Sequence, residues 1–294
     1  MNENKKVLLA FLAVSFFWGS TYLAIRIGVE DLPPFLFAGL RFLIAGSLML
    51  AYAKWKGHAF PTEIKDVTKV SIVGLLMLLG GNGLVVYAEQ WVHSGIASLL
   101  VSTVPLTIAV IEIFILRQKK MHYTGFIGLL IGFGGVAYLA LGDSSGTVID
   151  LLGTVLLLIA STSWSIGSVF SKTFETKSAI TTNIGIQMLA GGLGLTLVGL
   201  VLGELSRFQF TPNSFWSLVY LIFFGSLIGY SCYIYVLAKW PASKAGTYAY
   251  INPVVAVLLG AAILNEPFTP AVILSMVIII GGVFLVQRAK IENI

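Results

Sequence analysis

Ten long apolar segments run through this 294-residue chain and limit its fold more than any other feature. A helix needs about 20 mostly apolar residues to cross the hydrocarbon core of a bilayer. Only 11% of the residues are charged, against about 25% in a typical soluble domain. The sequence therefore predicts an all-α membrane protein. The predicted membrane-spanning helices are 7–27, 35–53, 70–90, 94–116, 123–141, 149–171, 180–203, 214–237, 241–264 and 270–287.

The basic residues are distributed unevenly between the two ends of the predicted helices. Fifteen of the 18 Lys and Arg residues fall on the side that holds both chain ends. Arg26 and Arg207 fall on the other side, and Arg41 lies within a helix. Cytoplasmic loops of membrane proteins are rich in Lys and Arg. We therefore expect a multi-pass protein of the cell membrane with both termini in the cytoplasm. The net charge of +5 follows from this topology and does not indicate a nucleic acid partner.

The two halves of the chain share features in the same order. The segments SFFWGSTYLAIR (15–26) and STSWSIGSVFSK (161–172) have the same length, and a shift of 146 residues places Trp18 on Trp164. Similar shifts align the remaining helices of the first half with those of the second. The order of these matches indicates an internal repeat of five helices.

Because five is an odd number, the second repeat must cross the membrane in the opposite direction. Inverted repeats of this kind are common in secondary transporters, where exchange of the two halves alternates access to a central site. We predict two inverted five-helix repeats, 1–143 and 144–294, around a shared cavity. The alternative is a duplication without alternating access, as in some channels.

Several short motifs resemble those of one transporter family. YAEQWVHSGIASLLVSTVPL (87–106) and TYAYINPVVAVLLGAAILNEPFT (247–269) are similar to segments of the ten-helix drug/metabolite transporters of the EamA type, as are FWGSTYLAIRIG and LRFLIAG near the N-terminus. The resemblance covers essentially the whole chain. It implies an exporter or exchanger of amino acids, metabolites, nucleotide sugars or drugs, with a cavity between the repeats. One departure is that Glu266 follows Pro253, whereas Gln118 stands at the corresponding place after Pro105.

Arg41 is the most informative single residue, because it lies about two turns inside the second predicted helix. A charge at the bilayer centre costs between about 3 and more than 10 kcal/mol. One interpretation is that Arg41 faces the cavity and binds an anionic group of the substrate, such as a carboxylate. Gln187, its counterpart in the second repeat, would offer an amide. The alternative is that Arg41 extends toward the outer water.

Aromatic and amide side chains complete the predicted substrate site. Trp18 and Trp164 lie deep and are flanked by small polar residues, which suits the wall of a wet cavity; close helix packing is the alternative. Aromatic rings with polar tips can enclose and orient an organic substrate. The predicted substrate-binding residues are Trp18, Tyr22, Arg41, Asn82, Tyr87, Trp164, Gln187, Tyr230 and Tyr235.

Three further residues are candidates for coupling and gating. Glu112 lies within the fourth predicted helix, where a desolvated carboxyl group can bind a proton near neutral pH. The interpretation we favour is that Glu112 pairs with Arg117 or Lys119 at the cytoplasmic end. Pro105 and Pro253 are predicted mid-helix at matching positions, where a proline can bend a helix and allow it to act as a gate. A static kink is the alternative.

The sequence favours a transporter over an enzyme. GDSSG at 142–146 matches G-x-S-x-G, but the nucleophile elbow of a hydrolase needs a His partner, and all three His residues fall in predicted connections. We expect no metal and no cofactor. The expected function is export or exchange of small organic metabolites such as amino acids, with a multidrug or organic-cation carrier, an intramembrane enzyme and a channel as alternatives. The expected partners are a small-molecule substrate and the lipid bilayer, and the chain would act as a monomer or homodimer.

Overall fold

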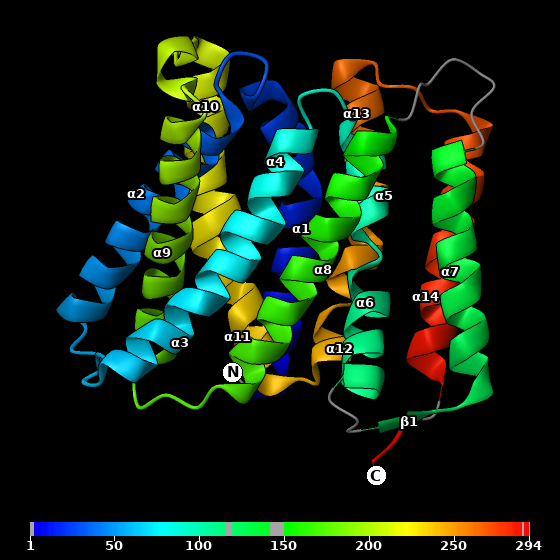
Figure 1. The fold of residues 1–294 in the computed structure, drawn as a ribbon, viewed down its shortest axis with the longest axis horizontal. Helices are drawn as coiled ribbons and strands as arrows, with labels where there is room; N and C mark the ends of the chain where they lie inside the picture. The colour runs from blue at the N-terminus through cyan, green and yellow to red at the C-terminus, as the bar shows by residue number, and fades with distance from the viewer. Residues whose placement is uncertain (1–2, 116–118, 142–149, 290, 294) are drawn as a thin grey trace.

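The computed structural model describes residues 3–115, 119–141, 150–289 and 291–293, which form a bundle of helices (Figure 1). Seven helical stretches are long and apolar enough to cross a membrane, and three shorter apolar helices accompany them. Each of the ten predicted segments overlaps one of these stretches, so the predicted helical membrane fold is confirmed. The proposed boundary between the repeats, at 143–144, lies outside the described residues.

The elements of the first half are α1 (Glu3–Gly28), α2 (Pro34–Trp55), α3 (Ile64–Gly74), η1 (Leu75–Gly83), α4 (Leu84–Ala88), α5 (Ser94–Val101), α6 (Val104–Val110), η2 (Ile111–Ile115), β1 (Lys119–Met121) and α7 (Tyr123–Leu141). Those of the second half are α8 (Leu151–Thr173), α9 (Ile180–Val201), η3 (Glu204–Arg207), α10 (Pro212–Tyr220), η4 (Leu221–Tyr230), α11 (Ser231–Lys239), α12 (Ala242–Ala245), α13 (Tyr248–Leu264), α14 (Pro270–Arg288) and β2 (Ile291–Asn293).

The helix α1 begins, and α14 ends, at the same end of the bundle (Figure 1). Because the spans alternate in direction, Lys54, Lys56, Lys172 and Lys177 also lie at this end, which we call the basic end. The other end, which we call the opposite end, holds Arg26. The predicted separation of charge is therefore present in the fold.

Helices that correspond in the two repeats pack against each other. The most extensive helix–helix contacts are those of α2 with α9 and of α7 with α14. A Cβ atom on Gly46 of α2 would lie 2.9 Å from the main-chain nitrogen of Leu189, and one on Gly192 of α9 would lie 2.9 Å from that of Leu43. The two helices thus approach at reciprocal glycines, which is the kind of close packing that small residues permit between membrane helices.

The third and eighth spans each contain a π-helical segment in their middle. η1 separates α3 from α4, and η4 separates α10 from α11. These two segments correspond to each other in the repeat, because both interrupt the third helix of their half. Single π-turns inside helices are frequent at functional sites. Both segments therefore mark the middle of the bundle as the place to look for a site.

The position of Pro105 differs from the prediction. The fourth span is broken between Val101 and Val104, and Pro105 lies in the first turn of α6. A proline is tolerated there, because the N–H groups of the first turn have no acceptor within the helix, so the missing N–H costs no hydrogen bond. Pro253 does lie inside α13, and the interruption in the ninth span falls earlier, between α12 and α13. The two prolines are therefore not equivalent mid-helix kinks. Gln118 lies outside the described residues.

Two acidic side chains bind the first turns of two helices at the opposite end. Glu204 accepts a hydrogen bond from the N–H of Leu36 in α2 at 2.9 Å. Glu266 accepts from the N–H of Ser94 at 2.9 Å and from its hydroxyl at 2.8 Å, at the start of α5. A negative charge at a helix N-terminus satisfies free N–H groups and interacts favourably with the helix dipole. Both carboxylates thus join a connection of the second repeat to a helix of the first.

A short two-stranded ribbon is the only β-structure among the described residues. β1 pairs with β2 in antiparallel register, with Lys119 opposite Asn293 and Met121 opposite Ile291. Because α7 and α14 lie along each other, the chain that enters α7 and the chain that leaves α14 come together at the basic end.

Candidate substrate site

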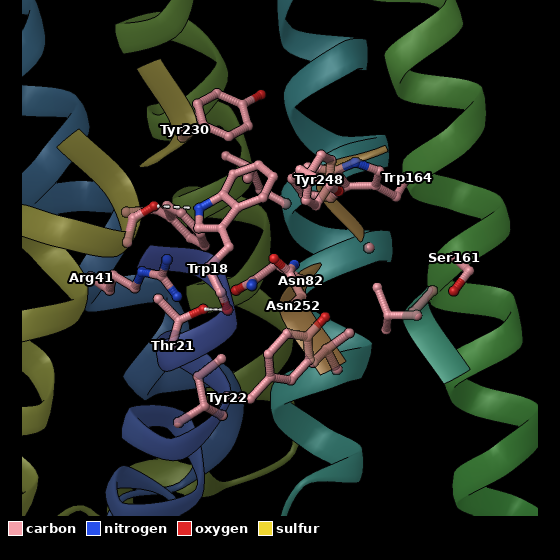
Figure 2. A pocket seen from close by; sticks show the side chains of 18 residues that line it. Trp18, Thr21, Tyr22, Arg41, Asn82, Ser161, Trp164, Tyr230, Tyr248 and Asn252 are labelled. Carbon is pink, nitrogen blue, oxygen red and sulfur yellow. Dashed lines mark hydrogen bonds between the residues drawn. The ribbon is translucent and has the colours of Figure 1, made fainter. Parts of the chain in front are cut away.

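A cavity of about 600 Å³ lies in the middle of the bundle. Its wall comes from α1, α2, η1, α4 and α5 of the first repeat and from α8, η4 and α13 of the second. Both π-helical segments η1 and η4 thus contribute to it. We call this space the central cavity, and the residues labelled in Figure 2 are Trp18, Thr21, Tyr22, Arg41, Asn82, Ser161, Trp164, Tyr230, Tyr248 and Asn252.

Arg41 is buried in the wall of the central cavity, with 3% of its surface exposed. Its Nε donates a hydrogen bond of 2.7 Å to the hydroxyl of Ser226 in η4, and its guanidinium lies 4.6 Å from the ring centroid of Phe42. Figure 2 shows the guanidinium pointing toward the side where the amide of Asn82 lies. No acidic side chain forms an ion pair with Arg41 among the described residues. The guanidinium is thus held by a neutral partner and presents its charge to the cavity.

Three polar atoms of the cavity wall are buried without a hydrogen-bond partner among the described residues. They are Nη1 of Arg41 and Nε1 of Trp164, which are donors, and Oδ1 of Asn82, which is an acceptor. Buried polar groups in proteins are nearly always hydrogen-bonded, and an unpaired one costs about 1–3 kcal/mol. A ligand that brings an anionic acceptor to Arg41 and a donor to Asn82 would satisfy two of these three atoms.

The two corresponding tryptophans meet inside the bundle. The ring centroids of Trp18 and Trp164 are 5.2 Å apart in an edge-to-face arrangement. Tyr248 packs against Trp18 at 4.9 Å, and Tyr233 packs against both indoles at 5.1 and 5.6 Å. Trp18 also donates from Nε1 to the carbonyl oxygen of Gly225 at 2.9 Å. The helices α1 and α8 therefore place the same residue type from each repeat at one aromatic cluster beside the central cavity.

Two corresponding glycines make room for these indoles. A Cβ atom on Gly229 of η4 would lie 2.4 Å from Nε1 of Trp18, and one on Gly81 of η1 would lie 2.9 Å from Cε3 of Trp164. The relationship is reciprocal, because each tryptophan packs against the glycine of the other repeat. The two halves of the chain thus interlock beside the cavity through a reciprocal pair of contacts.

Tyr230 separates the central cavity from a second space at the basic end. The second space, which we call the basic-end groove, has a volume of about 460 Å³ and is lined by residues that include Lys69, Lys172 and Gln187. Tyr230 lines the central cavity, and its hydroxyl donates to Oε1 of Gln187 at 2.9 Å. The hydrogen bond thus crosses the barrier between the two spaces.

The structure places six of the nine predicted substrate-site residues in the wall of the central cavity. These are Trp18, Tyr22, Arg41, Asn82, Trp164 and Tyr230. Gln187 lies in the basic-end groove. Tyr87 instead stacks on Phe35 at 5.3 Å, and Tyr235 packs against the hydrophobic core. Tyr87 and Tyr235 are thus not among the residues that line the cavity.

Glu112 lies in η2, near the basic end and apart from the residues that line the central cavity. It is buried, with 8% of its surface exposed. Arg117, one of its two predicted partners, lies outside the described residues, as does the GDSSG segment at 142–146.

Sequence reasoning missed several residues of the cavity wall. Thr21, Phe42, Ser161, Tyr248 and Asn252 also line it. Tyr248 and Asn252 stand four residues apart in α13, within the segment whose resemblance to the EamA type was noted. That spacing, which puts both on one helix face, was the signal available for finding them.

Comparison with known proteins agrees with this architecture. The profile of the EamA-like transporter family matches the chain twice, at residues 5–141 and 151–288. YedA of Escherichia coli (strain K12), named an uncharacterized inner membrane transporter, is 38% identical over 289 residues, covering 96% of this chain and 90% of YedA. YoaV of Bacillus subtilis (strain 168), named an uncharacterized transporter, is 30% identical over 287 residues, covering 95% of this chain and 96% of YoaV.

A known crystal structure shares the fold. One of its chains superposes with a TM-score of 0.70 at 22% sequence identity, covering 96% of this chain and 97% of that one. The matched family regions, the similar proteins and the ten apolar helical stretches agree with one another. The chain is a multi-pass membrane protein that belongs to the EamA-like transporter family.

Proposed function

We propose that this protein is a secondary transporter of small organic metabolites that carry an anionic group, such as amino acids, and that it exports or exchanges them by alternating access. The observation that carries the proposal is the unpaired Nη1 of Arg41, which is buried in the wall of the central cavity. A buried guanidinium without a carboxylate partner is costly. An anionic group of the substrate would offset that cost through charge-assisted hydrogen bonds.

The rest of the cavity wall supports an amphipathic substrate. Oδ1 of Asn82 is free to accept a hydrogen bond, for example from an ammonium or hydroxyl group of the same molecule. Indole and phenol rings from Trp18, Trp164 and Tyr248 offer an apolar surface for its body. A zwitterionic amino acid with an apolar side chain matches all three requirements.

The composition of the wall argues against the alternative of an organic-cation carrier. None of the described residues that line the central cavity is acidic. The one charged residue among them is Arg41, which would repel a cation bound in the same cavity. An organic cation is therefore the less suitable substrate.

The proposed transport cycle uses the two repeats. Access from the cytoplasm would pass through the basic-end groove, because lysine-rich ends face the cytoplasm in membrane proteins. The name of YedA places that similar protein in the inner membrane, and we propose the cell membrane for this chain as well. Movement of one repeat against the other would then open the central cavity to either side.

A ligand-stabilisation screen of the purified protein tests the substrate class. We expect amino acids to raise the thermal unfolding temperature, whereas their amides and esters, nucleosides and cationic drugs do not. Arg41→Met should remove the stabilisation, whereas Arg207→Met, a change outside the central cavity, should keep it. Stabilisation of the wild type by cationic drugs alone would contradict the proposal.

Transport in vesicles tests the mechanism. A ligand found in the screen should show counterflow, in which unlabelled substrate on one side drives uptake of labelled substrate from the other. Ohmic conductance without saturation would instead indicate a channel, and formation of a chemically altered product would indicate an enzyme. Arg41→Met should abolish the flux and leave membrane expression intact, so wild-type flux in this variant would reject the role of Arg41.

A further inference from the structure

Glu89 is a buried acidic residue that has no role in the function proposed above. It follows directly after the last residue of α4, at the opposite end of the bundle, and none of its surface is exposed. Among the residues that the structure describes, neither of its carboxylate oxygens has a hydrogen-bond partner. An ionised carboxylate that is buried without hydrogen bonds is strongly disfavoured, and such a group takes up a proton instead.

The charged and titratable groups that face Glu89 come from two elements. Tyr22 and Arg26 lie on α1, and Glu266 lies in the connection between α13 and α14. Burial raises the pKa of the Glu89 carboxyl well above its usual range, the negative charge of Glu266 raises it further, and Arg26 opposes both effects. Burial is the largest of these causes.

Arg26 does not neutralise Glu89 by direct contact. Its Nη1 donates to two main-chain carbonyl oxygens at the end of α4, those of Glu89 and Gln90, the latter at 2.7 Å. These carbonyls have no partner within the helix. Arg26 therefore joins α1 to the end of α4 through main-chain carbonyls, and no described residue forms an ion pair with the carboxyl group of Glu89.

The residues around Glu89 close the central cavity at the opposite end of the bundle. Tyr22 and Val85, which line the cavity, stand one turn before Arg26 on α1 and one turn before Glu89 at the end of α4. Glu266 at the same level binds the start of α5. Separation of α1 from α4 would open the cavity to this side and would bring water to Glu89.

From this arrangement we infer that Glu89 is a proton-binding site and that the opposite end of the central cavity closes only when the Glu89 carboxyl is protonated. The inference rests on the proposed alternating access. On opening, the hydrated Glu89 releases one proton to water and becomes a carboxylate. On closing, the carboxylate takes one proton from water and becomes a neutral acid, and no other bond changes.

Closure of the opposite end should therefore depend on pH. The closed state binds the proton more tightly than the open state, so acid favours closure and the preference is lost as the pH rises through the pKa of the closed state. For a single proton the ratio of open to closed protein changes by at most about tenfold per pH unit.

The accessibility of a cysteine in the cavity tests this site without a substrate. The background is Cys232→Ala, which removes the only cysteine of the chain. Val85→Cys then reports on the cavity near Glu89, and Ser206→Cys, at an exposed position of the opposite end, is the reference. A membrane-impermeant maleimide is applied to intact cells, and Val85→Cys labelling is divided by Ser206→Cys labelling at each pH.

When Glu89 is unchanged, we expect the ratio of Val85→Cys labelling to Ser206→Cys labelling to rise with pH. With Glu89→Gln it should stay low at every pH, because the neutral amide mimics the protonated acid. Glu89→Asp should keep a transition with a shifted midpoint, and Glu112→Gln, the matched control, should keep the transition of the parent. A Glu89→Gln protein that retains the parent transition, or a parent without any transition, overturns the inference.

Two further outcomes are also decisive. If Glu89→Gln does not reach the membrane, an unchanged midpoint in Glu89→Asp contradicts the site. If Ser206→Cys is labelled only in everted vesicles, the proposed orientation is wrong, and the same ratio measured in those vesicles still decides the role of Glu89. Failure of the ligand screen leaves this assay unaffected.

Discussion

The hydroxyl of Tyr230 donates a hydrogen bond of 2.9 Å to Oε1 of Gln187, and the two residues belong to different spaces of the molecule, the central cavity and the basic-end groove. The Tyr230–Gln187 hydrogen bond must therefore break when a path opens from the central cavity to the basic end. The bond joins η4 to α9, both in the second repeat, so a change within one repeat is enough to break it.

Tyr230→Phe should therefore weaken the barrier at the basic end. Loss of one buried hydrogen bond costs about 1 kcal/mol, so we expect a several-fold increase in labelling of a cysteine in the cavity from the basic-end side. Tyr233→Phe, which loses a bond of 2.8 Å to Ser168 within the aromatic cluster, is the control. Equal effects of the two changes would argue against a specific barrier at Tyr230.

Gly229→Ala should impair binding through Trp18. The new methyl group would have to share space with Nε1 of Trp18, and overpacking of this kind costs about 1–3 kcal/mol. We expect at least a several-fold loss of ligand affinity, with a smaller loss for Gly81→Ala beside Trp164. Gly134→Ala is the control, because a Cβ atom at that position on α7 meets nothing within 4 Å. Titration calorimetry with a ligand from the screen would measure these effects.

Ser226→Ala should lower the affinity for anionic substrates while leaving the fold intact. The serine hydroxyl holds Nε of Arg41 at 2.7 Å, and a hydrogen bond to a charged group contributes about 1.5–3 kcal/mol. A loss of about tenfold in affinity is the expected result. Ser231→Ala provides the comparison, since the buried Ser231 hydroxyl has no partner among the described residues. A matching loss in Ser231→Ala would mean that Ser226 has no specific role.

Glu204→Ala should reduce stability without changing which ligands bind. Glu204 is 1% exposed and accepts from the N–H groups of Phe35 and Leu36, which would lose their partner. We expect a loss of about 1–3 kcal/mol, seen as a lower thermal unfolding temperature. The exposed Glu30 at the same end is the control, and Glu30→Ala should unfold like the wild type.

Hydrophobicity alone was enough to predict the spans of this protein, because each helix must cover the thickness of the bilayer. The meeting of Trp18 and Trp164 was also foreseeable in part, since the repeat predicted a shared role for them. What the sequence could not provide was the direction in which each side chain points. Most of these helices carry apolar residues on all sides. The sequence therefore shows no helical periodicity of polar residues that would identify the face toward the cavity.

Tyr87 and Tyr235 illustrate this limit. Both follow a π-helical segment, and each residue added to a helical turn rotates everything after it by about 100°. An alignment that assumes regular helices therefore places them on the wrong face. Glu89 was missed for a different reason: it stands at the predicted end of a helix, where an acidic residue is expected to be solvated.

The pairing of α7 with α14 has a consequence for how such proteins diversify. Neither helix contributes a described residue to the wall of the central cavity, and each makes its main contact with the other. Selection for a new cargo can therefore act on the remaining helices while this pair stays unchanged. Conversely, drift in the pair should alter lipid preference or self-association and leave cargo choice as it was.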